Sequence, residues 1–282
     1  MSLVAVGCGL HYEVPEPSTL LVSVAAARTP YQGVLTESFA LEPRTASEER
    51  IVGFEDNRIF RVSAPAGPLA ISYVATVELR PSVEDPPKVQ EAYYATLRPD
   101  VLPYLHPSRY CESDRLLRFA NQEFGHLLPG YSRVTAVCNW TYGHLQYLPG
   151  STTAHTTACD VLVQRTGVCR DYAHLAIALC RALCIPARYV SVYAVGLEPL
   201  DFHGVFEAYL GDRWYLFDAS RRAPVGGFVR IGTGRDAADA SFATILGLAR
   251  MTGMTVWCRD TTGESTTGGL PFPSSDAAVS TA

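Results

Sequence analysis

The sequence lacks the patterns that mark several classes of protein. Its 23 basic residues are outnumbered by 28 acidic ones, which gives a formal net charge of −5. No basic stripe with interleaved aromatic residues occurs, so we expect no nucleic-acid partner. The apolar N-terminus, LVAVGCGL, has no basic segment before it and is too short for a signal peptide or a membrane span. We therefore expect no membrane partner either.

The cysteines lack the spacings of metal and redox sites. No CxxC pair occurs, and Cys180 and Cys184 lie one turn apart on a single helical segment. Neither a zinc site nor a redox motif is predicted, and we expect no cofactor and no metal. Most of the cysteines are interpreted as small buried hydrophobes in a reducing compartment, so the expected location is cytoplasmic. The eight cysteines are at positions 8, 111, 138, 159, 169, 180, 184 and 258.

The first part of the chain has the composition of a β-structure. With 48% hydrophobic residues, the 282-residue chain is long enough for one large core or two smaller ones. Short β-rich runs alternate with turn residues up to about position 80, a pattern that favours an antiparallel sandwich or barrel. Six prolines follow in residues 81–107. We place a boundary there and predict a separately packed β-rich N-terminal domain, residues 1–95.

The middle of the chain is predicted to be helical and then to return to strands. Ser113 and Thr157 are expected N-caps, the latter with Asp160 in a capping box. Residues 96–258 are expected to form the second domain, which takes in strands such as MTVWC near its end. The tail, residues 259–282, is poor in bulky apolar side chains and is expected to be disordered. The predicted strands after the last helix are ARYVSVYAVG, HGVFEAYL, RWYLFDAS and MTVWC.

Cys169 is the first candidate for chemistry. It directly follows Gly167-Val168 and begins a run whose apolar residues recur at helical spacing, at Tyr172, Ala176, Leu179 and Leu183. Unpaired N–H groups and the macrodipole at a helix N-terminus favour thiolate over thiol, and the same N–H groups can bind an oxyanion. Cys169 is therefore a candidate nucleophile. The alternative is a cysteine that only packs at the start of the helix.

His203 and Asp218 are predicted to be neighbours. His174 is five residues from Cys169 on the same helix and points about 140° away, so it is expected to pack or cap locally. Gly211-Asp212 suits a two-residue type II′ turn that places Leu210 opposite Arg213. In that register His203 and Asp218 are diagonal neighbours on one face, with Cβ atoms roughly 6 to 8 Å apart. Taken singly, each has a plainer interpretation, as a surface histidine and a turn residue.

Three segments together resemble the bacterial transglutaminase-like superfamily. They are GVCRDYAHLAIALCRALCIPARYVS, DFHGVFEAYLGDRWYLFDAS and VRIGTGRDAADASFATILG, within a match of about residues 105–247. The order Cys, then His, then Asp at the end of the next strand is similar to the catalytic core of that family. The resemblance implies an α+β, papain-like core in which helices pack on an antiparallel sheet, preceded by an all-β sandwich-like N-terminal domain.

By this resemblance Cys169 is the nucleophile, His203 the general base and acid, and Asp218 the residue that orients the imidazole. The Cys169 N–H would be one oxyanion donor, and the second is sought between Asn139 and Tyr147. The implied activity is that of a cysteine hydrolase or peptidase that cleaves peptide or isopeptide amides through a thioester acyl-enzyme. Its expected partner is a peptide, protein or acyl-thioester substrate. Two alternatives stay open: an amide-forming acyltransferase, and a catalytically silent binding module.

Three positions depart from the family pattern. Members usually carry His-Ala-Trp where this chain has His203-Gly204-Val205. Val205 is predicted to share the face of Asp218, and replacement of an indole by valine is expected to open the wall that shields the His203–Asp218 contact from water. Cys184 stands where a glycine or asparagine is usual, in a left-handed helix end, and Val192 where glycine is usual. We interpret these changes as altered substrate choice with the triad intact.

Overall fold

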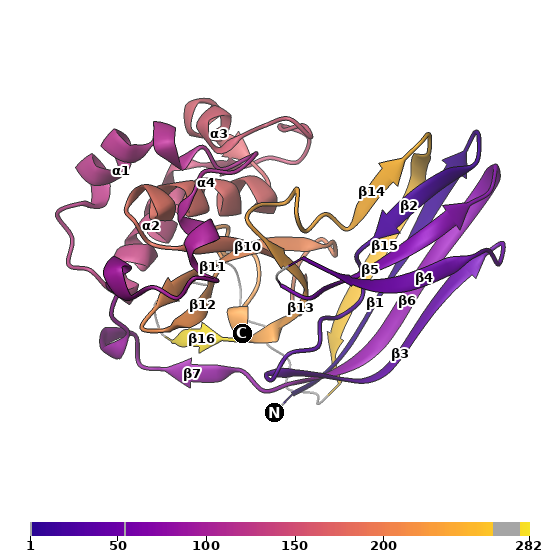
Figure 1. Ribbon diagram of the computed structural model, residues 1–282, viewed down its shortest axis with the longest axis horizontal. Helices are drawn as coiled ribbons and strands as arrows, with labels where there is room; N and C mark the ends of the chain where they lie inside the picture. Colours follow the sequence, from indigo (N-terminus) through magenta and orange to yellow (C-terminus); the bar gives the residue numbers. More distant parts are fainter. Residues whose placement is uncertain (1, 54, 262–276) are drawn as a thin grey trace.

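The computed structural model describes residues 2–53, 55–261 and 277–282. A β-sandwich lies beside a smaller antiparallel sheet, and helices cover one face of that sheet (Figure 1). This arrangement confirms the predicted α+β class with a sandwich-like part ahead of a helix-on-sheet core. None of the helices among these residues is long and apolar enough to cross a membrane.

The sandwich consists of two four-stranded sheets. Alternate residues of β1, β5 and β6 point into the shared core, and Ile71, Tyr73, Ala75 and Val77 of β6 are all buried, as the alternation predicts. The first sheet has the order β15-β1-β6-β3, formed by Arg250–Asp260, Ser2–Val14, Gly67–Leu79 and Gln32–Glu42. The second has the order β14-β2-β5-β4, formed by Ala243–Leu246, Ser18–Val22, Asn57–Ala64 and Ser47–Val52.

Two strands of the sandwich come from the far end of the chain. β15 pairs along β1, with Cys8 opposite Val256, and β14 pairs with β2. The sequence predicts that residues 96–258 form the second domain. The structure corrects this boundary, because β14 and β15, within residues 243–260, belong to the sandwich. This pairing has a simple physical reason. β1 and β2 each have an edge whose backbone N–H and C=O groups need hydrogen-bond partners, and β15 supplies them for β1 as β14 does for β2.

The second part packs helices on one sheet. The sheet has the order β12-β11-β10-β13, formed by Arg213–Phe217, His203–Leu210, Ala187–Ala194 and Phe228–Gly234. The helices are α1 (Leu117–Phe124), α2 (Tyr131–His144), α3 (Ala158–Gln164) and α4 (Cys169–Ala182). Helix α4 is the central one: it packs on β10 and β11 and touches the other three helices. Its apolar residues dominate the core between helices and sheet.

Short elements complete the chain. Two-residue strands β8 (Gln146–Tyr147) and β9 (Thr166–Gly167) pair in parallel, and β7 (Ser82–Glu84) pairs with β16 (Ala278–Ser280). The 3-10 turns are η1 (Pro86–Lys88), η2 (Tyr94–Thr96), η3 (Leu102–Leu105), η4 (Ser113–Arg115) and η5 (Val225–Gly227).

Of the two predicted N-caps, Thr157 is confirmed and Ser113 is wrong. Thr157 accepts the Asp160 N–H while the Asp160 carboxylate accepts the Thr157 N–H, which confirms the capping box. Ser113 does not cap a helix: it begins the 3-10 turn η4, and α1 starts four residues later, at Leu117.

The β11–β12 hairpin has the predicted register but not the predicted turn. Leu210 faces Arg213, as expected. Gly211 and Asp212 have φ angles of +50° and +67°, so both central residues are left-handed and the turn is type I′ rather than type II′. Aspartate tolerates the left-handed conformation, so a Gly-Asp pair can form either a type I′ or a type II′ turn.

The core of the sandwich extends into the second part, contrary to the expectation of a separately packed N-terminal unit. Tyr193 and Ile231, from β10 and β13, belong to the same apolar cluster as the inward-facing residues of the sandwich. The Gln32 side-chain amide bonds both backbone groups of Arg230, at 2.9 and 2.8 Å. The Asn57 amide does the same for Thr233, at 2.7 and 2.8 Å. The sandwich is therefore attached along β13, the edge strand of the second part's sheet.

The end of the chain is ordered, and the prediction of a disordered tail is wrong there. β16 is buried, and Thr281 accepts a hydrogen bond of 2.9 Å from Arg230. Val279 packs against the sheet face opposite α4. Pairing with β7 and apolar contacts offset the ordering entropy of this short segment. The rest of the tail, residues 262–276, lies outside the described residues.

Cys184 gives a direct test of backbone strain. It has a φ of +61°, the left-handed conformation predicted from its place at the end of α4, and it is exposed. Since its side chain is exposed, replacement by glycine removes strain without opening a cavity. We expect Cys184→Gly to raise the free energy of unfolding by about 1 kcal/mol, measured by urea denaturation. Cys184→Ala is the control, because alanine keeps the Cβ; an equal gain there would contradict the explanation.

Candidate active site

Cys169 is the first residue of α4, and local contacts fix its position. The Asp171 carboxylate accepts hydrogen bonds from the Val168 N–H at 2.9 Å and from the Thr152 hydroxyl at 2.7 Å. Gly167 is required just before, since a Cβ there would lie 2.8 Å from the Cβ of Asp171. The Cys169 side chain is half-buried, whereas five of the eight cysteines are buried. The predicted nucleophile is thus accessible at a rigid helix start.

His203 and Asp218 lie together as the hairpin register predicts. His203 Nε2 is 2.9 Å from Asp218 Oδ2. Asp218 Oδ1 accepts hydrogen bonds from the Ser220 N–H at 2.8 Å and from its hydroxyl at 2.6 Å. Both His203 and Asp218 are 1% exposed. The carboxylate is therefore held in one orientation against the imidazole, out of contact with bulk water.

Burial and pairing act in opposite directions on these two groups. Burial disfavours the charged imidazole, but the nearby Asp218 carboxylate outweighs it, and the pKa of His203 is raised. Burial also disfavours the carboxylate, and His203 with Ser220 reverses that effect, so the pKa of Asp218 is lowered. The pair favours an imidazolium beside a carboxylate at neutral pH.

Cys169 completes the group. Its side chain interacts with the His203 imidazole and adds to the rise of the His203 pKa. Within the described residues, His203 Nδ1 has no hydrogen-bond partner, while Nε2 contacts Asp218. The structure thus brings together all three residues singled out from the sequence, with Nδ1 as the ring nitrogen left for the thiol.

Tyr147 is a fourth residue of the site. It lies opposite Gly167 in the β8–β9 pair, and Gly167 is two residues before Cys169 in the chain. Burial raises the pKa of the Tyr147 phenol, and both the side chain and the backbone N–H of Cys169 act on the same group. Sequence analysis placed it in a candidate segment, Asn139 to Tyr147, but no spacing rule identified it there.

His174 is a core residue, as predicted. It is fully buried, stacks on Tyr110 with ring centroids 5.0 Å apart, and accepts a 3.1 Å hydrogen bond at Nε2 from the Ala237 N–H. Burial, aided by the positive charge of Arg170, lowers the pKa of His174 to about 3. A neutral imidazole facing away from Cys169 packs the helix and takes no part in the site.

The expectation that Val205 leaves the His203–Asp218 contact open to water is wrong. Val205 is fully buried in an apolar cluster that includes Phe228 of β13 and Val279 of the C-terminal segment. The Phe228 ring meets the His203 ring edge-on, with centroids 5.8 Å apart. Side chains from other strands therefore exclude water where the family pattern would use an indole. Val192, the other departure, is also buried and pairs with His203 across β10 and β11.

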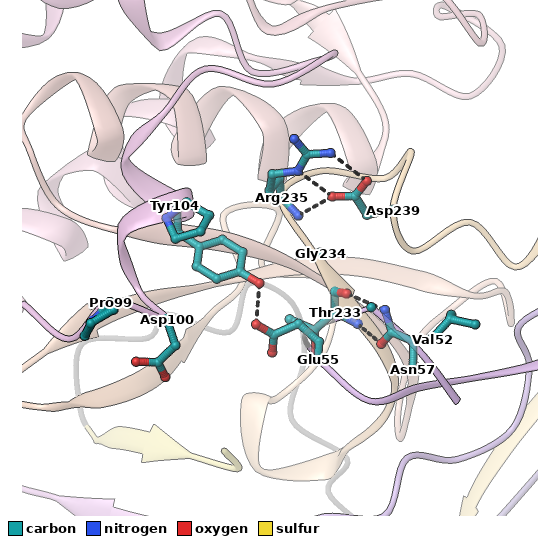
Figure 2. Close-up of a pocket in the computed structure, with 12 residues that line it drawn as sticks. Val52, Glu55, Asn57, Pro99, Asp100, Tyr104, Thr233, Gly234, Arg235 and Asp239 are labelled. Atoms are coloured by element: carbon teal, nitrogen blue, oxygen red, sulfur yellow. Dashed lines mark hydrogen bonds and ion pairs between the residues drawn. The ribbon is translucent and has the colours of Figure 1, made fainter. Parts of the chain in front are cut away.

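A cavity of about 610 Å³ lies elsewhere, between the β4–β5 turn, the segment around η3 and the end of β13 (Figure 2). None of Cys169, His203 and Asp218 lines it. Its polar side chains bond one another: Tyr104 donates to Glu55, and Arg235 pairs with Asp239 at 2.9 Å. Among the described residues, no group of three or more His, Cys, Asp or Glu side chains is placed to hold a metal ion.

Comparison with known proteins matches both parts of the chain. Residues 118–219 match the model of the transglutaminase-like superfamily, and residues 3–89 match the bacterial transglutaminase N-terminal domain. A crystal structure from Cytophaga hutchinsonii, described as a candidate cysteine protease, is 41% identical with a TM-score of 0.92. The superposition covers 99% of this chain and 97% of that one.

Mycobacterial proteins match over shorter stretches. An uncharacterised protein of Mycobacterium leprae is 33% identical over 117 residues, which are 38% of this chain and 42% of that protein. An uncharacterised protein of Mycobacterium tuberculosis is 50% identical over 52 residues, 18% of this chain and 17% of that protein. These matches span less than half the length of either relative.

Gly204 stands where the family pattern His-Ala-Trp has alanine, and the structure gives a reason for the difference. A Cβ at this position would lie 2.4 Å from Tyr189 Oη and 3.1 Å from two carbons of its ring. We expect Gly204→Ala to lower the free energy of unfolding by about 1–3 kcal/mol, and by less in a Tyr189→Phe background. A double-mutant cycle by thermal denaturation measures the difference. Gly226→Ala, where the Cβ meets nothing within 4 Å, is the control; equal costs in both tyrosine backgrounds would contradict the explanation.

Proposed function

The chain belongs to the transglutaminase-like superfamily, and from that premise we propose that it is a cysteine-dependent hydrolase or peptidase. It cleaves peptide or isopeptide amides through a thioester acyl-enzyme, with Cys169, His203 and Asp218 as its triad. The observation that carries the proposal is the buried 2.9 Å contact between His203 and Asp218, beside a thiol at the start of α4. The likeness to the Cytophaga hutchinsonii candidate cysteine protease supports the same reaction class.

The proposed reaction has two stages. The Cys169 thiolate attacks the carbonyl carbon, and the resulting oxyanion collapses to a thioester while the C–N bond breaks. The His203 imidazolium gives its Nδ1 proton to the leaving amine. Water then attacks the thioester, His203 takes one of its protons, and the acid leaves as the thiolate is regenerated. Asp218 stays ionised throughout and keeps the imidazole aligned.

The Cys169 N–H and the Tyr147 hydroxyl are the proposed oxyanion donors. Both belong to one small cluster, because the phenol interacts with the thiol and with the N–H of the same residue. Preorganised donors at this place stabilise the charge that develops on the carbonyl oxygen. Transfer of the acyl group to an amine in place of water would use the same intermediate, so it stays an alternative outcome for the same site.

All eight cysteines are free in the structure, which supports our proposal of a reducing, cytoplasmic location for the chain. The natural acyl donor is proposed to be a peptide, a protein or an acyl thioester.

Cysteine labelling tests the assignment of the triad. We expect iodoacetamide below pH 7 to alkylate Cys169 at least about tenfold faster than the other seven thiols, as mapped by peptide mass spectrometry. Asp218→Asn and His203→Gln should both slow this labelling, because each removes the charged imidazole beside the sulfur. Ser220→Ala, which keeps the carboxylate, is the milder control. Equal labelling rates in the wild type and both triad variants would favour the binding module.

Tyr147→Phe tests the second oxyanion donor. We expect the substitution to lower kcat for p-nitrophenyl acetate by about 100-fold, the loss typical of one oxyanion-hole donor. Alkylation by iodoacetamide forms no oxyanion, so its rate at Cys169 should change far less. A matched control is Tyr142→Phe, which removes a hydroxyl from the same segment at an exposed position. A parallel fall in both rates for Tyr147→Phe would assign the residue to packing alone.

A further inference from the structure

Two consecutive arginines, Arg221 and Arg222, follow Asp218 in the loop after β12. The Arg222 N–H donates a 3.0 Å hydrogen bond to Asp218 Oδ2, the same oxygen that faces His203. Arg221 has a φ of +54°, a left-handed conformation that residues with a Cβ rarely adopt. Such conformations are kept where the surrounding structure demands them, and they gather at functional sites. The loop is therefore a fixed part of the triad's surroundings.

Both side chains contact tyrosines at the end of α2 and in β8. The Arg221 guanidinium lies 4.4 Å from the centre of the Tyr142 ring, and the Arg222 guanidinium lies 4.8 Å from that of Tyr147. Tyr147 in turn interacts with Cys169. Stacking on a tyrosine face holds each guanidinium flat and leaves its edge N–H groups directed outward. Two positive charges thus lie along one wall of the site.

The donors of these arginines are not used up. Within the described ranges, neither arginine forms an ion pair with an aspartate or glutamate. Arg222 donates to the backbone oxygen of Glu198, and its Nε is buried without a partner. Arg221 donates to the side-chain oxygen of Asn139. Each guanidinium has five N–H groups, so most of them remain available.

Three other arginines of the same part of the molecule are paired with carboxylates, whereas Arg181 donates only to backbone oxygens and to the Ser108 hydroxyl. Arg170, next to Cys169, pairs with Asp171 at 2.9 Å. Arg188 and Arg230 both pair with Glu207 in the sheet. Arg221 and Arg222 lie side by side in one loop without a carboxylate partner among the described residues, so two adjacent positive charges are open to an anion from outside.

We propose that Arg221 and Arg222 form a carboxylate-binding subsite, so that the preferred acyl group carries a carboxylate close to the scissile carbonyl. This inference rests on the proposed acyl-enzyme reaction at Cys169. The planar guanidinium fork matches a carboxylate through two parallel N–H···O bonds, which gives orientation as well as attraction. The carboxylate would lie over the Tyr142 and Tyr147 wall, with the carbonyl next to the sulfur.

Paired alkylating reagents test the subsite. Iodoacetate and iodoacetamide react with a thiolate by the same displacement of iodide, but only iodoacetate carries a carboxylate. We expect the ratio of the iodoacetate rate to the iodoacetamide rate to be higher at Cys169 than for free cysteine. Arg222→Gln and Arg221→Gln should each lower the iodoacetate rate by about tenfold, with a much smaller change for iodoacetamide.

The variants separate the arginines from the other charges at the site. The His203 imidazolium also attracts anions, and it is unchanged in both variants. Arg165→Gln is the matched control, because the Arg165 guanidinium also stacks on an aromatic ring, but on that of Trp140 at 5.2 Å and not on Tyr142 or Tyr147. An iodoacetate preference that survives both substitutions, or that falls equally in Arg165→Gln, would overturn the subsite.

Failure of the subsite and failure of the proposed function give different results. If iodoacetamide fails to label Cys169 preferentially, the proposed function is wrong, and the subsite has no reaction to serve. If iodoacetamide labels Cys169 while iodoacetate has no advantage, only the subsite is wrong. Near-ultraviolet circular dichroism of each variant shows whether the fold is kept.

Protection of Cys169 from iodoacetamide by small ligands distinguishes a side-chain carboxylate from a terminal one. N-acetylglutamate α-amide carries only the side-chain carboxylate, N-acetylglutamine only the α-carboxylate, and N-acetylglutamine amide neither. At matched ionic strength, we expect one of the two anionic compounds to slow iodoacetamide labelling of Cys169 more than the neutral one does. The stronger of the two identifies an acidic side chain or a chain terminus as the natural carboxylate. Equal effects of all three compounds, or no effect, would contradict the subsite.

Discussion

The buried contact between His203 and Asp218 is the constraint on which the site depends. An imidazole and a carboxylate that are each 1% exposed are costly to bury apart, and their pairing is what makes the arrangement stable. Each group shifts the pKa of the other in the direction of the charged form. The thiol at the start of α4 thereby faces a cation that stays in one place. The chemistry proposed for Cys169 follows from this fixed charge.

The rest of the fold keeps that contact dry and aligned. Phe228 comes from the strand that carries the sandwich, and Val279 from the end of the chain, yet both lie in the cluster around Val205. Gln32 and Asn57 attach the sandwich to the same strand through paired amide bonds. The N-terminal part therefore does more than precede the helix-on-sheet part: it is bonded to β13, the strand whose Phe228 covers His203. This role explains why a valine is sufficient where the family pattern has an indole.

Local features of the fold were predictable from the sequence because local rules determine them. The Gly211-Asp212 turn set the register that joins His203 to Asp218, and the Thr157 cap and the left-handed Cys184 followed from short-range patterns. The partners of β15 were not predictable, because alternation shows that a strand exists and not which distant edge it completes. The roles proposed for Tyr147 and Arg222 depend on the packing of segments far apart in the chain, and spacing carries no such information.

The protonation state of His203 is the most direct test of this account. Nuclear magnetic resonance of ring-labelled histidine, with His203 assigned from a His203→Gln variant, follows the imidazole between pH 5 and 9. Because Asp218 raises the pKa of His203, the ring should stay charged through pH 7 in the wild type. In Asp218→Asn the larger of the two effects that raise the His203 pKa is lost, while burial still lowers it, so the ring should lose its charge at a lower pH than in the wild type. A wild-type His203 that titrates near its ordinary value, unchanged by Asp218→Asn, would contradict the account.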